Sequence, residues 1–369
     1  MILRIVSRYI RDGFLLTFLL TLAVFTFVMC VMVLFKIADP IAMGGSLWLI
    51  FKIFAAGLPS ALGFSIPVSI ITSALLTFGR LSANGEITAM KSSGIRMLQI
   101  IQQPVIYALL CTALCLYLNS EIIPTTYHAR REALRQLGAE TPLQLIEEGR
   151  FIRDFPGYTF YFGSKKDQTI SDVIIYQHEK GHPSRTIRAK NGTVRTSEDK
   201  TSLLIDLFDV RIDPFYEDRP GPGTCSQFPL IINIDRLGGE PQTVKKKSDM
   251  TILELQDALD NARALYPELD PEKLEWQKAS LQVELHKRIV LSLSCLAFVL
   301  LGVPLATKTQ RKESTIGIGI SLALVFFFYL FVIIAESLSK HPGWQPHLIV
   351  WIPPVLAMSL GSYLIRRCD

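Results

Sequence analysis

Six apolar runs, each long enough to cross a membrane, constrain this chain more than any other feature. They cover residues 13–35, 55–78, 98–120, 289–306, 314–335 and 347–365. A transmembrane helix needs about 20 mostly apolar residues to cross about 30 Å of hydrocarbon. The composition agrees, because 49% of the residues are hydrophobic, 19% are charged and the mean hydropathy is +0.32. The sequence therefore predicts a membrane protein with six transmembrane helices.

Basic residues in the short connections predict the orientation. Most of them lie at the two termini or after the second and fourth runs: Arg4, Arg8, Arg11, Arg80, Lys91, Arg96, Lys308, Arg311, Lys312, Arg366 and Arg367. The opposite short connections contain only Lys36, Lys52 and Lys340. Because Lys and Arg are enriched in cytoplasmic loops, we expect both termini in the cytoplasm. The net charge of +5 reflects this orientation, and no basic patch indicates nucleic acid as a partner.

The region between the third and fourth runs, residues 124–286, has the composition of a soluble domain, and the loop charges place it outside the cytoplasm. Four of its segments alternate between apolar and polar residues as antiparallel strands do: 158–163, 171–177, 201–212 and 228–234. The stretches "KNGT" and "RPGPG" supply turn signals. We therefore expect a β-sandwich or an open β-fold, inserted between the transmembrane regions 1–123 and 287–369.

Helices are expected on both sides of these strands. Thr251 and Glu254 have the spacing of a capping box. Asp270, followed by Pro271 at the first helical position, marks the start of a helix that runs into the fourth apolar run. Residues 129–137 continue the third run as a helical extension. Movement of the membrane helices could therefore be passed to the inserted domain.

No motif supports an enzyme or a metal site. The sequence contains no GxxxxGK[ST] phosphate loop, no HExxH motif, no plausibly spaced Ser/His/Asp set and no CxxC or Cys/His cluster. Glu121 and Glu336 lie near the outer ends of their runs, whereas an ion-coupled carrier usually places acids near the midplane. We interpret them as interfacial residues, and we expect no catalytic residue, cofactor or metal in this chain.

A short polar helix is predicted in "GRLSANGEITAMKSSGIRM", residues 79–97, between the second and third runs. Asn84 or Ser82 can cap it, Gly94 can end it, and about two helical turns fit over residues 86–93. We expect this helix at the cytoplasmic membrane surface. The pattern alone fits a plain connector equally well.

Several stretches of the chain resemble one family. They are "FGRLSANGEITAMKSSGIR", "EEGRFIRDF", "YTFYFG", "ISDVIIYQ", "IRAKNGTV", "ELHKR" and "LGVPLATKTQRKESTIGIG". In this order, with six spans and a β-rich insert, they are similar to the lipopolysaccharide export permease subunits of the LptF/LptG (YjgP/YjgQ) family. The similarity covers essentially the whole chain.

The resemblance implies a fold and a set of partners. It implies a periplasmic β-jellyroll over 124–286 and a pairing of this subunit with a second permease subunit, either a paralogue or itself. It also implies a dimer of cytoplasmic ABC ATPases that binds ATP and Mg²⁺, and a periplasmic β-jellyroll protein that receives the lipid. Together they would extract lipopolysaccharide from the inner membrane of a bacterium with an outer membrane.

The resemblance also implies roles for particular residues. Residues 84–94 would form the coupling helix, in which Glu86 matches an acidic family residue. Ile87 and Met90 share one helix face, and Lys91 adds a charge, so these residues are expected to contact the ATPase. Lys36 is similar to a family lysine that meets lipid phosphates, although its side chain could also simply extend to the interface.

Two other functions are compatible with the sequence. One is a secondary carrier of an amphiphile, which would need an ionisable pair inside the bundle. The other is a mechanical transmitter, in which an ATPase moves the external domain to act on a cell-wall enzyme. The sequence leaves open whether the chain is an F-type or a G-type subunit.

Overall fold

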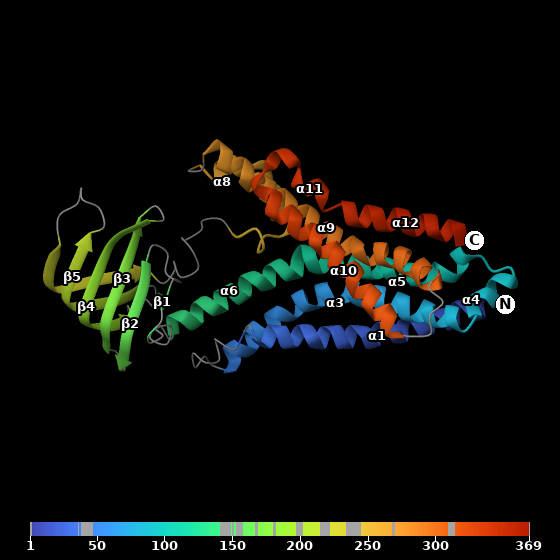
Figure 1. The fold of residues 1–369 in the computed structure, drawn as a ribbon, viewed down its shortest axis with the longest axis horizontal. Coiled ribbons are helices and arrows are strands. Elements are labelled where there is room, and N and C mark those ends of the chain that lie inside the picture. Colours follow the sequence, from blue (N-terminus) through green and yellow to red (C-terminus); the bar gives the residue numbers. More distant parts are fainter. Residues whose placement is uncertain are drawn as a thin grey trace. The chain divides into compact units, whose positions relative to one another are not determined.

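The computed structural model describes residues 2–35, 37, 47–140, 149, 151–152, 158–166, 169–179, 182–196, 202–214, 222–233, 245–267, 270–308 and 314–368. The chain forms two compact units (Figure 1). The helical unit comprises residues 1–35, 56–128 and 246–369, and the β unit comprises 36–55 and 129–245. Residues 246–286, which the sequence assigned to the inserted domain, thus belong to the helical unit.

Six helices in the described part of the chain are long and apolar enough to cross a membrane. Each contains all or most of one predicted run: α1 (Ile2–Phe35), α3 (Leu47–Ala83), α5 (Met97–Tyr117), α9 (Pro271–Lys308), α10 (Ser314–Ser337) and α12 (Ile352–Cys368). The short α4 (Glu86–Ser92) joins α3 to α5. The prediction of six apolar helices is therefore confirmed.

The helix that begins as α5 changes its winding once. A single π-helical turn, Leu118–Ile122, separates α5 from α6 (Ile123–Glu140). A π turn inserts one extra residue and is frequent at functional positions. The helical extension predicted for residues 129–137 lies within α6.

The centre of the helical unit is formed by α3 and α9. Within the most apolar 18-residue segment of each helix, 83% of α3 and 61% of α9 is buried, compared with 6% of α1. On α12, Gly361 lies directly against the backbone of Leu300 on α9, so any side chain there would collide with it. Small residues of this kind let membrane helices approach closely. Consequently α9 is packed on several sides, whereas α1 lies at the periphery.

Shorter helices surround the first part of α9. They are α7 (Ile252–Asp260), α8 (Ala262–Leu265), two 3₁₀ turns at Leu338–Lys340 and Pro342–Trp344, and α11 (Pro346–Ile349). The capping box predicted for α7 is present. The Thr251 amide donates to the Glu254 carboxylate at 2.9 Å, and the Thr251 hydroxyl accepts from the Glu254 amide at 3.3 Å. As predicted, α9 begins at Pro271.

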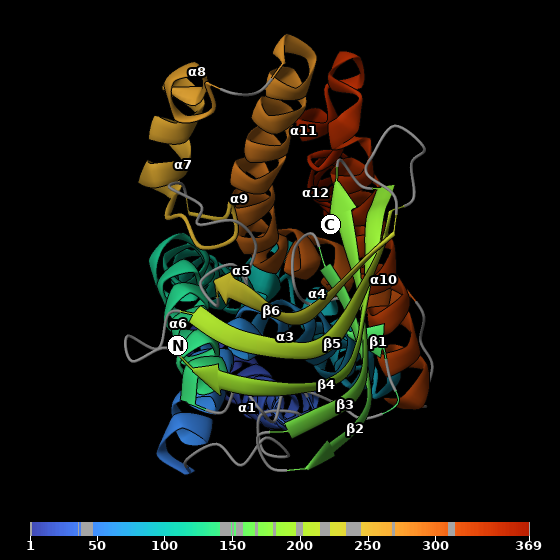
Figure 2. The same ribbon diagram turned by 90° about the vertical axis from the view of Figure 1, so that its left-hand side faces the viewer.

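The β unit contains one antiparallel sheet of consecutive strands. They are β1 (Phe151–Ile152), β2 (Tyr158–Lys166), β3 (Thr169–Glu179), β4 (His182–Thr196), β5 (Ser202–Pro214) and β6 (Gly223–Asn233). Neighbours in sequence pair in the order β1 to β6, and the sheet is strongly curved (Figure 2). The described strands thus form a meander, and the jellyroll expectation is not confirmed.

The curvature has a local origin in the strand pairing. At one level of the sheet, one residue in each of β2 to β5 is not paired with a residue of the neighbouring strand. These residues are Gly163, Asp172, Lys190 and Asp209. Asp172 and Asp209 have left-handed φ values of 51° and 53°. At this level the alternation of buried and exposed side chains shifts by one residue. The consecutive buried positions are 170 and 173 on β3, and 207 and 210 on β5, three residues apart instead of two. Such irregularities bend a strand and increase its twist.

One predicted turn is wrong. "KNGT", residues 190–193, lies inside β4 rather than between two strands. An added Cβ at Gly192 would lie 3.0 Å from the Leu207 side chain and 3.1 Å from that of Ile170. Glycine is needed here because neighbouring strands approach closely. In the sequence alone, such a glycine cannot be distinguished from a glycine that forms a turn. Most of "RPGPG" lies outside the described residues.

Candidate functional site

The short helix α4 is bounded by two glycines with left-handed backbone conformations. Gly85 precedes it with φ 72°, and Gly94 follows it with φ 80°. After the helix, the Ile95 amide donates to the Met90 carbonyl at 3.1 Å, as in a Schellman motif. A residue with a side chain would be strained at Gly94, so the sequence ends the helix sharply here.

The predicted side-chain cap of α4 is absent, and the two candidate residues make other hydrogen bonds. Gly85 occupies the cap position and no side chain caps the helix. The Asn84 side-chain amide donates to the Glu86 carboxylate at 3.1 Å. The Ser82 hydroxyl donates to the Thr307 carbonyl at 2.9 Å and so ties the end of α3 to the end of α9.

The two faces of α4 differ in what they contact. Ile87 is only 5% exposed and belongs to the core of the helical unit, and Met90 is partly buried against the same core. Thr88, Ala89 and Lys91 are exposed. The Ile87 side chain thus anchors α4 to its own bundle, and the expected contact of Ile87 with the ATPase stays a prediction.

Glu86 connects α4 to α1. Its half-buried carboxylate accepts a hydrogen bond from the Asn84 side chain and interacts electrostatically with the Tyr9 hydroxyl of α1. Nearby, the Arg80 guanidinium lies against Gly13 of α1, 3.4 Å from where a Cβ would stand. A displacement of α4 would therefore act on α1 through Glu86, while Arg80 links α3 to α1.

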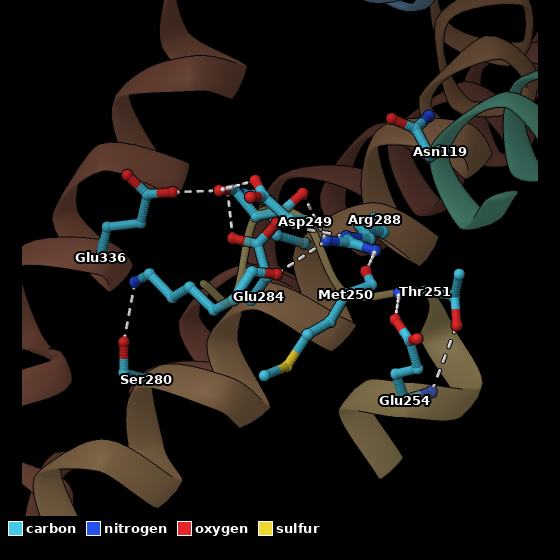
Figure 3. A network of polar contacts seen from close by, with 12 residues as sticks. Asn119, Asp249, Met250, Thr251, Glu254, Ser280, Glu284, Arg288 and Glu336 are labelled. Atoms are coloured by element: carbon cyan, nitrogen blue, oxygen red, sulfur yellow. Dashed lines mark hydrogen bonds and ion pairs between the residues drawn. The ribbon is translucent and has the colours of Figure 1, made fainter. Parts of the chain in front are cut away.

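A second polar cluster lies further toward the start of α9 (Figure 3). The Arg288 guanidinium donates to the Glu284 carboxylate at 3.2 Å, to the Met250 carbonyl at 2.5 Å and to the Lys247 carbonyl at 2.9 Å. The Lys247 ammonium in turn donates to the Ser280 hydroxyl at 2.7 Å. Arg288 thereby fastens the segment that precedes α7 to α9.

The charges of this cluster are buried to different degrees. The side chains of Arg288 and Glu284 are 5% and 9% exposed, and that of Lys287 is 19% exposed. Lys287 also contacts Glu336 of α10, whose side chain is 42% exposed. Buried charges are tolerated when they are paired and hydrogen-bonded, as they are here.

The family described as lipopolysaccharide export system permease LptF/LptG matches residues 8–367. The chain belongs to this family. No match was found among curated proteins. As a member of the LptF/LptG family, the chain is a component of a lipopolysaccharide transport system rather than an enzyme.

The predicted LptF/LptG site residues are distributed unevenly over the structure. Glu86, Ile87, Met90 and Lys91 lie together on α4. Lys36, the predicted lipid contact, lies outside the described residues. Within the described ranges, no group of three or more His, Cys, Asp or Glu side chains could hold a metal ion.

The cluster around Arg288 was missed as a site by sequence reasoning. Its signal is present in "ELHKR", where Glu284 stands three and four residues before Lys287 and Arg288, on one helix face. Such a triplet directly before an apolar run could have marked a buried ion network. Its partners Met250 and Glu336 are far away in sequence, so only the fold brings them in.

Proposed function

We propose that this chain is a permease subunit of an ABC-type exporter that extracts lipopolysaccharide from the inner membrane. The observation that carries the proposal is the match to the LptF/LptG family over residues 8–367. The chain would pair with a second permease subunit, and a separate cytoplasmic ATPase dimer would bind ATP and Mg²⁺. The charge bias of the short loops supports cytoplasmic termini and an external β unit.

In this proposal α4 is the coupling helix. Thr88, Ala89 and Lys91 are exposed and would face the ATPase, with Glu86 at the rim of the contact. The negative charge of Glu86 at the N-terminal end of α4 suits a basic residue on the ATPase and also the dipole of its own helix. Force on α4 would reach α1 through Glu86 and Tyr9.

The β unit would hand the lipid to a periplasmic β-jellyroll protein. β6 lies at an edge of the sheet, and Ile231 on it is 66% exposed. Edge strands carry unpaired backbone groups that can add a strand from another protein. Lys36 would contact phosphate or sugar-acid groups of the entering lipid, since it directly follows the predicted first span.

Reconstitution tests the proposal. The detergent-purified complex is analysed by mass spectrometry for subunits and bound lipid, and is then placed in liposomes with lipopolysaccharide and a soluble periplasmic acceptor. We expect an ABC ATPase, stoichiometric lipopolysaccharide and ATP-dependent transfer of lipid to the acceptor. Absence of both the ATPase and ATP-dependent transfer would overturn the exporter function. Stoichiometric lipid would also argue against a subunit that only transmits movement.

A further inference from the structure

α10 packs against the rest of the helical unit along one stripe of its surface. Its buried side chains follow one another at alternating steps of four and three residues: Ser321, Val325, Phe328, Val332 and Ala335. Phe326 and Ile333, on other sides of the helix, are 64% and 61% exposed. Ile320, Leu324 and Tyr329, next to these residues, are partly buried against the same core, so α10 has the usual apolar face of a packed helix.

Polar contacts supplement this stripe toward both ends of α10. The Thr72 hydroxyl of α3 donates to the Ser321 hydroxyl at 3.1 Å. The Lys287 ammonium of α9 donates to the Glu336 carboxylate at 2.7 Å. The second contact is an ion pair, and it lies at the solvent-exposed edge of the contact between α9 and α10.

Lys287 has two carboxylate partners of different kinds. Glu284, on the same helix, lies 2.6 Å away, is 9% exposed and is also held by Arg288. Glu336 comes from α10 and is 42% exposed. If α10 moves, Lys287 keeps Glu284 while Glu336 enters water. Separation is therefore inexpensive, unlike the breaking of a fully buried pair.

A cavity of about 180 Å³ lies beside these charges. Its lining includes Glu284, Lys287 and Arg288, together with Ser60 of α3, Asn119 of the π turn, Tyr127 of α6 and Tyr329 of α10. A space of this size holds several water molecules or one small polar group, because a water occupies about 30 Å³ in the liquid. The hydroxyl groups of Tyr127 and Tyr329 can donate to the oxygens of such a group, whereas the Ser60 hydroxyl donates to the Gly57 carbonyl at 2.7 Å.

We propose that Lys287 is an anion-exchange site, in which Glu336 occupies the place that a phosphate ester takes when α10 moves away from α9. This inference rests on the proposed function, because it links the movement of α10 to the passage of a phosphorylated lipid. The chemistry is that of a phosphate group on an ammonium. Its source can be a lipid headgroup or phosphate in solution.

The ligand class follows from the chemistry of the exchange. Carboxylate and phosphate oxygens both accept charge-assisted hydrogen bonds from an ammonium, and lysine binds phosphate as a point charge. Lys287 stands two residues before the apolar run 289–306, and residues at the end of a membrane span lie at the depth of lipid headgroups. Arg288 cannot exchange in the same way, because backbone carbonyls of the segment before α7 hold its guanidinium.

Zero-length crosslinking of the wild-type chain reports the exchange without any substitution. A carbodiimide joins an ammonium and a carboxylate that are in contact, so the yield of the Lys287–Glu336 crosslink measures how often the pair is closed. The Lys278–Glu275 pair of α9, 3.0 Å apart and exposed, is the internal control for reagent consumed by phosphate. Mass spectrometry gives the ratio of the two crosslinks.

The full-length chain is compared in phosphatidylcholine nanodiscs, where each phosphate ester is neutralised by its own choline, in nanodiscs that contain the net anionic phosphatidylglycerol, and in phosphatidylcholine nanodiscs with inorganic phosphate. We expect the Lys287–Glu336 ratio to fall about threefold with phosphatidylglycerol, the size typical of replacing one partly exposed ion pair. An equal fall with inorganic phosphate supports the exchange and assigns the source to solution. An unchanged ratio in both arms overturns the proposal.

Two variants give an independent readout. Labelling by a photoactivatable phosphatidylglycerol should rise at the first part of α9 in Glu336→Gln, which removes the competitor, and should fall to background in Lys287→Gln. The thermal midpoint of each variant checks that it is folded. Equal labelling of both folded variants and the wild type overturns the proposal. None of these measurements uses ATP, so exchange without ATP-driven release would contradict the exporter function alone.

Discussion

Ile87 and Thr88 are neighbours on α4, yet the structure assigns them opposite roles, which a pair of substitutions can separate. Ile87→Ala removes three carbon atoms from a side chain that is 5% exposed. At about 0.8 kcal/mol for each buried CH₂, the transfer contribution is about 2.4 kcal/mol. The remaining cavity brings the expected loss of stability to about 2.5–4 kcal/mol.

Thr88→Arg, in contrast, changes an exposed position to a better helix former, so stability should change by less than about 0.5 kcal/mol. It adds bulk and positive charge next to Glu86 on the face proposed to meet the ATPase. We therefore expect Thr88→Arg to reduce copurification of the ATPase while the permease unfolds as in the wild type.

The assay has two parts. Thermal unfolding of the detergent-solubilised permease without ATPase measures stability, and affinity copurification measures ATPase binding. We expect Ile87→Ala to lower the unfolding midpoint by several degrees, and Thr88→Arg to leave the midpoint unchanged and to weaken binding. The reverse result, a stable Ile87→Ala that loses the ATPase and a Thr88→Arg that keeps it, would show that Ile87 is the contact residue.

Three further predictions follow from the same structure. Glu86→Lys should impair ATPase copurification and reconstituted lipid release while the permease stays folded, with only a small fall in its unfolding midpoint from the lost helix-dipole interaction, whereas wild-type levels of both would reduce α4 to a connector. Lys36→Asp should weaken lipid crosslinking and the stimulation of ATP hydrolysis by lipid, and unchanged crosslinking would leave Lys36 as an interfacial residue. Arg288→Met should cost about 3–5 kcal/mol of stability, because Glu284 loses one of its buried cations. Arg288→Lys, its matched control in charge, should unfold at an intermediate temperature, and a wild-type midpoint for Arg288→Met would refute the anchoring role.

Local signals in the sequence were reliable where a single segment contains all the information. Each apolar run became a helix because the length and apolar character of a run are properties of that run alone. The capping box at Thr251 formed as predicted, since both of its hydrogen bonds join residues three apart. The positions of Pro271 and Gly94 likewise predicted where helices begin and end.

Signals that depend on a distant neighbour could not be interpreted in the same way. Asn191–Gly192 is a common turn pair, yet here Gly192 makes room for Leu207 and Ile170 from the strands on either side. The helical period placed Ile87 and Met90 on one face of α4. It could not tell whether that face meets the chain's own core or a partner.

The sequence by itself thus determined the six apolar helices, the presence of strands in the insert and the family, because these follow from local periodicity and from motif order. Only the tertiary structure decided the contacts of Glu86 with Tyr9 and of Lys287 with Glu336, and the curvature of the sheet. These contacts join residues 77 and 49 positions apart, and no local pattern encodes which segments pack together. Side-chain burial is set by all neighbours at once, so it emerges only when the chain is folded.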